Sequence, residues 1–164
     1  MQGVSDQLPV VILAAGRGRR LAPFTDGTPK CLVPVGSTSA LGLLFAWLRG
    51  RKPAEVILVT GHACDRIRRF LSEESAPFPV REVFNPKYDS TNNIYSAVLS
   101  RDFCPDGFLL LNSDLICHPR ILDAAVEGPP STFLVVDPTL PPRPEAMKVR
   151  YAGDRLVAIG KDLD

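Results

Sequence analysis

The chain has 164 residues, of which 45% are hydrophobic and 23% are charged, and it carries a formal net charge of +1. This composition is typical of a folded globular domain, and the length is enough to bury a core. The small net charge argues against nucleic acid or an anionic membrane as the main partner, and no apolar stretch is long enough to span a bilayer. We therefore expect one domain over residues 1–164.

The cysteines point to a reducing environment. Cys31, Cys64, Cys104 and Cys117 form no CxxC pair and have no zinc-binding spacing with the two histidines. No secretory signal pattern precedes the first apolar run, Val10–Ala15. We expect reduced thiols that serve mainly as packing groups, and a cytoplasmic protein.

Strand-like and helix-like apolar patterns alternate along the chain. Ser37 or Ser39 is expected to cap the first helix, and Gly153-Asp154 to form the turn of a hairpin. In chain order, the sequence predicts a strand at 9–15, a helix at 39–51, a strand at 55–60, a helix at 65–72, a strand at 80–84, a helix at 91–101, a strand at 107–111, a helix at 119–127, a strand at 132–136 and a hairpin of residues 147–151 and 156–160.

This alternation predicts an α/β fold. Strands that alternate with helices form a mostly parallel sheet covered on both faces. In such sheets ligands bind at the carboxyl ends of the strands. The loops that begin at Gly16, Asn85 and Asn112 are therefore the candidate binding loops.

A glycine- and arginine-rich loop follows the first predicted strand, from Gly16 to Lys30. Its small residues let backbone N–H groups approach phosphate oxygens, and Arg20 and Lys30 supply positive charge for a polyphosphate. The loop lacks the GxxxxGK[ST] pattern of a P-loop, and Leu21 stands where a dinucleotide-binding loop has its third glycine. The GxG pattern alone leaves a simple tight turn as the alternative.

Asp114 follows the predicted strand 107–111, at the carboxyl edge of the sheet. A carboxylate there is well placed to hold Mg²⁺ against phosphate oxygens. Taken alone, however, the residue is better explained as a cap of the next helix.

Amide side chains gather in the segment that follows the third predicted strand, at Asn85, Asn92 and Asn93. Amides can read the edge of a nucleobase through paired donor and acceptor groups. They also cap helices, and Thr91 or Asn92 is expected to cap the helix at 91–101. The residues alone leave both roles open.

The glycine-rich loop belongs to a longer string, LAAGRGRRLAPFTDGTPKCLVPVG, which runs from Leu13 to Gly36. It resembles the signature of the nucleotidyltransferases that make NDP-sugars and CDP-alcohols, with one departure at Arg19, where that family has a small hydroxyl residue. The resemblance implies a Rossmann-like, GT-A-like fold of three layers with a mostly parallel, mixed sheet. It also implies catalytic phosphate contacts by Arg20 and Lys30, and a nucleotide loop of Leu13, Ala14, Ala15, Gly16, Arg17 and Gly18.

The later segment N-x-x-Y-x-x-T-N-N-x-Y-S, residues 85–96, resembles the cytidylyltransferase branch that acts on phosphocholine, phosphonates or inositol phosphate. The resemblance implies CTP as the nucleotide, read by Asn85, Thr91, Asn92 and Asn93. It implies Asp114 as the ligand of the Mg²⁺ cofactor, although Ser113 replaces the family's glycine. It makes Lys161 and Lys148 the candidates for contact with the acceptor phosphate.

The expected function is therefore Mg²⁺-dependent transfer of CMP from CTP to a small phosphate or phosphonate acceptor, with release of pyrophosphate. Two alternatives stay open: a sugar-1-phosphate nucleotidyltransferase that uses UTP, dTTP or GTP, and a nucleotide-binding domain without turnover. Members of the family continue beyond the position of Lys161 with a second metal-binding carboxylate. We therefore expect the chain to lack a C-terminal part, which a longer chain or a partner in a homo-oligomer would complete.

Overall fold

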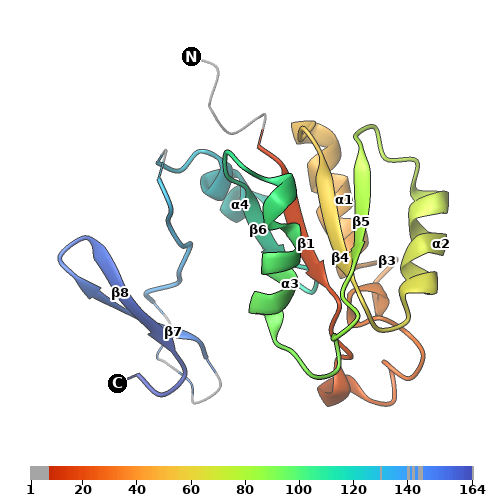
Figure 1. Ribbon diagram of the computed structural model, residues 1–164, viewed down its shortest axis with the longest axis horizontal. Helices are drawn as coiled ribbons and strands as arrows, with labels where there is room; N and C mark the ends of the chain where they lie inside the picture. Colours follow the sequence, from red (N-terminus) through yellow and green to blue (C-terminus); the bar gives the residue numbers. More distant parts are fainter. Residues whose placement is uncertain (1–7, 130, 140, 142, 144–145, 164) are drawn as a thin grey trace. The chain divides into compact units, whose positions relative to one another are not determined.

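A parallel sheet with the strand order β5-β4-β1-β6 forms the centre of the first part of the chain (Figure 1). Its strands are β1 (Val10–Ala14), β4 (Val56–Thr60), β5 (Val80–Phe84) and β6 (Leu109–Asn112). All neighbours pair in parallel, with Ala14 opposite Thr60, Thr60 opposite Phe84, and Leu13 opposite Asn112. The carboxyl ends of the strands therefore meet at one edge of the sheet, as the sequence predicts.

The computed structural model describes residues 8–129, 131–139, 141, 143 and 146–163, which divide into two compact units between Phe133 and Leu134. Each unit is described by itself. No helix in the described residues is both long enough and apolar enough to cross a membrane.

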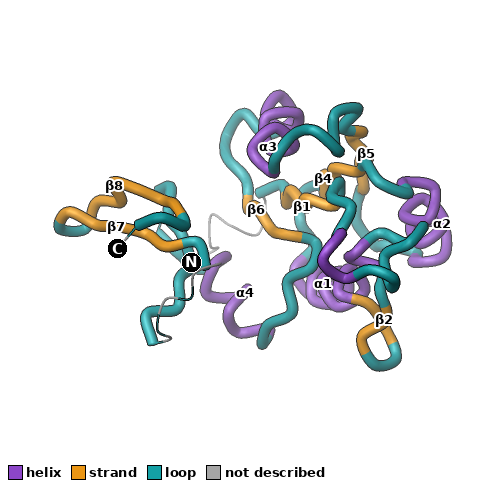
Figure 2. Tube along the Cα trace, turned by 90° about the horizontal axis from the view of Figure 1, so that it is seen from below, coloured by secondary structure: helices purple, strands orange, loops and turns teal. Residues whose placement is uncertain are grey.

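Helices cover both faces of the sheet in the first unit, which gives the expected three layers (Figure 2). The helices α1 (Ala40–Arg51), α2 (Cys64–Glu74) and α4 (Pro119–Val126) pack on one face, and α3 (Asn93–Ser100) packs on the other. Alternation along the strands supplies both cores, because successive side chains point to opposite faces. In β1, Ile12 faces α1 and Leu13 faces α3.

Short elements complete the first unit. They are the 3₁₀ turns η2 (Arg19–Leu21), η3 (Lys30–Leu32) and η4 (Arg101–Phe103), and a small antiparallel pair of β2 (Pro34–Val35) and β3 (Thr38–Ser39).

The helix caps follow the sequence closely. Ser39, one of two predicted caps, begins α1, and its Oγ accepts a hydrogen bond from the backbone N–H of Gly42 at 3.1 Å. Asn92, again one of two, begins α3 and accepts from the N–H of Ile94 at 3.1 Å. These side chains satisfy N–H groups that have no partner inside the helix.

The second unit contains a hairpin of β7 (Lys148–Ala152) and β8 (Arg155–Gly160), as predicted. The turn lies at Gly153-Asp154, where Gly153 has a φ of +60° that favours glycine. A register irregularity interrupts the pairing between Arg150 and Tyr151.

The predicted strand at 132–136 is wrong, because these residues form no regular element. A strand needs a neighbour that takes up its backbone N–H and C=O groups, and this segment pairs with no strand in the described residues. Its apolar side chains are only partly covered, with Phe133 38% and Val136 44% exposed. The strand prediction for this segment depended only on its run of apolar, β-branched residues. Such a run favours a strand but does not ensure that another segment pairs with it.

Replacing Ile12 by aspartate tests the core. Ile12 is fully buried in β1, so the substitution places a carboxylate among apolar side chains. We expect the first unit to lose at least about 4 kcal/mol and to unfold in a thermal or urea melt. The matched control is Ile121→Asp in α4, where the side chain is 47% exposed. If the Ile12→Asp variant unfolded at the same temperature or urea concentration as the Ile121→Asp control, the assignment of Ile12 to the core would be contradicted.

Candidate active site

The loops after β1, β4 and β6 lie side by side at the carboxyl edge of the sheet. Backbone hydrogen bonds join them: His62 N–H donates to the carbonyl of Ala15 at 3.0 Å, and Ser113 N–H donates to that of Leu13 at 3.2 Å. A Cβ added to Gly61 would meet the carbonyl oxygen of Ala15 at 2.7 Å. The loops approach each other this closely because glycine follows β4.

The glycine-rich loop wraps a small cavity of about 200 Å³, which Gly18, Arg19, Arg20, Leu21 and Lys30 line. Gly18 has a φ of +64°, and a Cβ there would lie 2.8 Å from Cβ of Lys30. Buried Thr25 holds this bend, because its hydroxyl donates to the carbonyl of Gly18 at 3.1 Å. The loop thus gathers three cationic side chains around one hollow, and Arg19, the departure from the family signature, is one of them.

Lys30 and Asp114 form an ion pair, although 84 residues separate them in the sequence. Lys30 begins η3 and Asp114 follows β6, and each side chain is a little over one third exposed. The predicted phosphate-binding lysine and the predicted metal-binding aspartate therefore share one place. Both remain open to solvent, so an entering anion can reach the ammonium group.

Cys31 lies directly beside this pair and is almost completely buried. Burial raises the pKa of its thiol to about 11. The thiol therefore stays protonated at neutral pH and is a packing group rather than a nucleophile.

The donor chemistry at Asp114 fits Mg²⁺ only as a site shared with substrate. Mg²⁺ is commonly held by one or two carboxylates together with phosphate oxygens and water. Asp114 offers one carboxylate next to the cationic hollow. Within the part of the chain that the structure describes, no three histidine, cysteine, aspartate or glutamate side chains gather to hold a metal ion.

Asn85 lies inside the protein, only 1% exposed. Its amide Nδ2 donates to the hydroxyls of Ser96 at 3.0 Å and Thr91 at 3.4 Å, and its Oδ1 accepts from the N–H of Lys87 at 2.8 Å. Thr91 in turn donates to the carbonyl of Lys87 at 2.7 Å. Asn85 and Thr91 therefore hold the loop 85–91 in shape against α3.

Asn92 and Asn93 lie at the exposed N-terminus of α3. Asn92 is the helix cap, whereas Asn93 Nδ2 donates to Oδ1 of Asn112 at 3.3 Å. Asn112 ends β6, two residues before Asp114. Among the predicted amides, Asn93 is thus the one that a hydrogen bond connects to the segment containing Asp114.

Tyr88 is the first tyrosine of the 85–96 pattern, which by itself assigned it no role. It packs against Gly61, where a Cβ would meet Cβ of Tyr88 at 2.5 Å. The guanidinium of Arg17 lies 5.7 Å from the centre of its ring, and the His62 ring centre lies 6.3 Å away. An aromatic ring, a guanidinium and an imidazole therefore meet beside the nucleotide loop. Two sequence features mark this contact: Gly61, which directly follows β4, and the tyrosine position of the 85–96 pattern.

The two predicted acceptor lysines belong to the second unit, and the structure brings them to the same end of its hairpin. Lys148 begins β7 opposite Gly160, and Lys161 follows Gly160 directly. The ammonium group of Lys148 donates to the carbonyl oxygen of Leu163.

Replacing Gly18 by alanine tests whether this bend positions Lys30. The new methyl group would displace the Lys30 side chain, and the positive φ adds strain of about 1 kcal/mol. We expect nucleotide affinity to fall at least about tenfold while the fold persists, measured by titration calorimetry. Gly27→Ala is the matched control, because Gly27 has a φ of +70° and open space around it. Equal losses in both variants would show that strain alone, and not the contact with Lys30, causes the effect.

The first unit combines a parallel sheet, a cationic glycine-rich loop and a carboxylate at the carboxyl edge of the sheet. The sequence profile of the MobA-like NTP transferase domain matches residues 10–142, and the chain belongs to this family.

Among curated proteins, the chain is 33% identical over 139 residues to the CMP-5'-(3-aminopropyl)phosphonate synthase of Streptomyces rubellomurinus; the match covers 84% of this chain and 22% of that protein. Among solved structures, it resembles CTP:phosphocholine cytidylyltransferase from Streptococcus pneumoniae, with 31% identity, a TM-score of 0.58, and coverage of 66% of this chain and 45% of the other. The inositol-1-phosphate CTP transferase from T. maritima shares the fold, with 22% identity, a TM-score of 0.74, and coverage of 97% and 66%. The chain thus spans less than half the length of the first two relatives.

Proposed function

We propose that this chain is a cytidylyltransferase that transfers CMP from CTP to a small phosphate or phosphonate acceptor and releases pyrophosphate. The observation that carries the proposal is the meeting of Lys30 and Asp114 beside the cationic hollow of the glycine-rich loop. Two relatives with at least 31% identity are named for a CMP-phosphonate product and for CTP:phosphocholine chemistry, which supports CTP and this class of acceptor.

In the proposed reaction, an acceptor oxygen forms a bond to the α-phosphorus of CTP while the bond to the bridging oxygen of the β-phosphate breaks. No protein nucleophile is needed, because the acceptor is itself an anion. Catalysis then depends on position and on neutralising negative charge. Lys30 would exchange its contact with Asp114 for the triphosphate, and Arg20 would stabilise the leaving pyrophosphate. Asp114 would hold Mg²⁺, which supplies further charge neutralisation at the phosphates.

Base recognition is proposed for the exposed groups around α3. Asn93 and Asn92 carry amides at the helix N-terminus, and Tyr88 offers a ring face beside the nucleotide loop. Asn85 and Thr91 contribute by holding the loop that carries Tyr88, because their polar groups are occupied inside the protein. The backbone from Leu13 to Gly18 would lie along the nucleotide.

For the rest of the site, we propose that Lys148 and Lys161 meet the acceptor phosphate, and that both units belong to one nucleotidyltransferase domain. Their place at one end of the hairpin gives two positive charges to a single anion. We also propose that the protein works in the cytoplasm. Four free cysteines, two of them buried, support a reducing compartment.

Turnover with four nucleotides tests the proposal. Pyrophosphate release is measured with CTP, UTP, GTP and dTTP at equal concentrations, each with phosphocholine, 3-aminopropylphosphonate or inositol 1-phosphate, with and without Mg²⁺. We expect CTP to be preferred at least about tenfold, with release dependent on one acceptor and on Mg²⁺. Rates with UTP equal to those with CTP would overturn the choice of base. Tight CTP binding without any release would instead identify a nucleotide-binding domain without turnover.

A further inference from the structure

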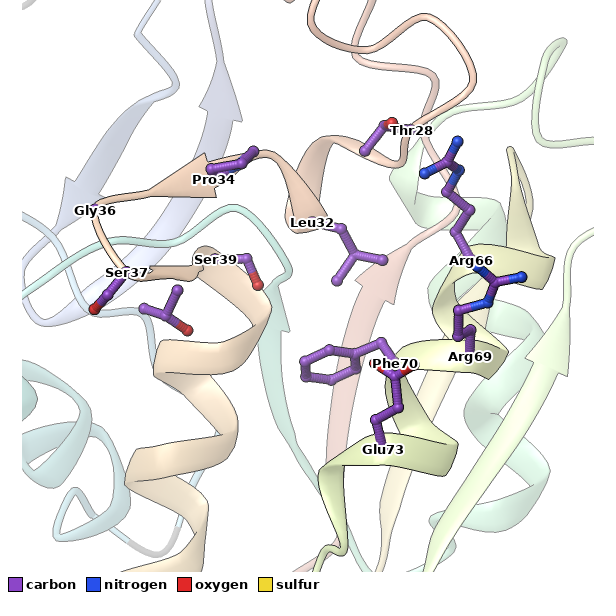
Figure 3. A pocket seen from close by; sticks show the side chains of 11 residues that line it. Thr28, Leu32, Pro34, Gly36, Ser37, Ser39, Arg66, Arg69, Phe70 and Glu73 are labelled. Carbon is purple, nitrogen blue, oxygen red and sulfur yellow. The ribbon is translucent and has the colours of Figure 1, made fainter.

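A second cavity, separate from the cationic hollow, is lined in part by Leu32 of η3. Its volume of about 450 Å³ falls within the range of small-molecule binding sites. Helix α2 forms one wall and the β2-β3 segment forms the other (Figure 3). No residue of this cavity lines the hollow that we assign to the triphosphate.

Two arginines of α2 stand at one side of this cavity. Arg66 and Arg69 are three residues apart and therefore share a face of the helix, and Figure 3 shows both side chains on the α2 side of the cavity, with Arg66 reaching toward Thr28. Neither guanidinium group makes a hydrogen bond or an ion pair within the described residues. Their neighbour Arg68, in contrast, pairs with Glu82 and Asp65. Glu73 also lines the cavity, four residues after Arg69, but it forms an ion pair with neither guanidinium group.

The floor of the cavity is apolar. Leu32 and Phe70 lie between the arginines and the opposite wall, where Ser37 and Ser39 stand (Figure 3). Phe70 is fixed in place by an edge-to-face contact with the ring of buried Phe45, with ring centres 5.4 Å apart. A ligand that enters therefore meets positive charge at one end and a preformed apolar surface in the middle.

We propose that this cavity is a regulatory site for a small molecule that carries a phosphate group and an apolar or aromatic body. Guanidinium groups bind phosphate through paired hydrogen bonds, and two of them on adjacent turns match a dianion. The body of the molecule would lie on Leu32 and Phe70. The site is separate from the triphosphate hollow and does not depend on turnover.

The two sites share one structural element. Leu32 lines the second cavity and Lys30 lines the triphosphate hollow, and both belong to the three-residue turn η3. A ligand that packs on Leu32 therefore acts on the turn that carries Lys30. Occupancy of one site is expected to change affinity at the other, and this coupling is reciprocal by thermodynamic linkage.

Phenyl phosphate is a suitable probe, with phenol and inorganic phosphate as partial probes. In an NMR titration of the 164-residue chain, we expect saturable shifts of the backbone amides of Leu32, Ser37 and Phe70, with phenyl phosphate binding at least about tenfold tighter than either partial probe. The double variant R66A/R69A should weaken binding at least about tenfold, whereas the control R150A/R155A, with the same change of net charge, should not. Because both arginines of the cavity are exposed, their removal should leave the thermal melt unchanged.

Two further arms separate this proposal from the proposed function. Lys30→Ala should keep the phenyl phosphate shifts at Leu32 and Phe70 even if it loses CTP. Saturating phenyl phosphate should change the Kd for CTP at least about threefold in the wild-type chain and not in R66A/R69A. Equal binding by wild type and R66A/R69A would overturn the site. An unchanged Kd for CTP would overturn its regulatory role, whether or not the chain turns over CTP.

Discussion

Replacing Lys30 by alanine is expected to lower kcat/KM for CTP by about two to three orders of magnitude while the fold persists. Lys30 lies on a partly exposed turn, lines the cationic hollow and pairs with Asp114. Removing a positioned charge that stabilises the phosphates in the transition state typically has an effect of this size. The free energy of unfolding of the variant should lie within about 1 kcal/mol of the wild-type value, because an exposed ion pair adds little stability. Steady-state pyrophosphate release and a urea melt measure the two quantities.

Lys52→Ala is the matched control for this prediction. It removes the same charge from the exposed C-terminal end of α1, away from the carboxyl edge of the sheet. We expect wild-type turnover from it. Full activity in the Lys30 variant would remove the glycine-rich loop from the account of catalysis, whereas equal losses in both variants would point to net charge as the cause.

Replacing Asp114 by asparagine should reduce turnover by at least about a hundredfold and flatten its dependence on Mg²⁺ concentration. Asparagine keeps the size of the side chain and can still accept a hydrogen bond from Lys30, but it loses the charge that a hard cation requires. CTP binding without Mg²⁺ should change little. The measurement is pyrophosphate release across a Mg²⁺ titration, together with CTP affinity in the presence of a chelator.

Asp106→Asn serves as the control, since Asp106 is exposed near the amino end of β6, at the opposite end of the strand from Asp114. Its Mg²⁺ activation curve should match that of the wild type. An Asp114 variant with an unchanged Mg²⁺ midpoint and rate would show that this carboxylate does not hold the metal.

Much of the fold follows from local patterns. Apolar runs of strand length that alternate with capped helices predict the parallel sheet, and Ser39 and Asn92 act as caps in the structure. The prediction failed at residues 132–136, because pairing depends on a partner strand that local sequence does not encode. A β-strand exists only when a second segment pairs with it, and the local sequence pattern describes only the first segment.

The site was predictable in part. The signature string and the place of Asp114 after a buried strand predicted that Lys30 and Asp114 would share one edge of the sheet, and they form an ion pair. The direction of an amide was not predictable: Asn85 turns inward and bonds to Ser96 and Lys87, while Asn93 stays exposed. The hydrophobic periodicity does not predict whether an asparagine side chain points inward or outward. The same residue type can stabilise a loop from inside the protein or contact a ligand at the surface.

The contact of Tyr88 with Gly61 depends on how closely two loops approach. This distance is set by the packing of β4 and β5 on their neighbours, so it becomes visible only in three dimensions. The same holds for the cavity beside α2, where Arg66 and Arg69 look from the sequence like a solvated face. Their lack of carboxylate partners is what distinguishes them from Arg68.

A crystal structure with CTP and Mg²⁺ would test the central claim most directly. We predict that the triphosphate lies along Gly16–Gly18, with Lys30 bound to a phosphate oxygen, Asp114 at the metal, and the cytosine beside Tyr88 and Asn93. A triphosphate bound elsewhere, for example between Arg66 and Arg69, with the Lys30–Asp114 pair left intact, would contradict the account.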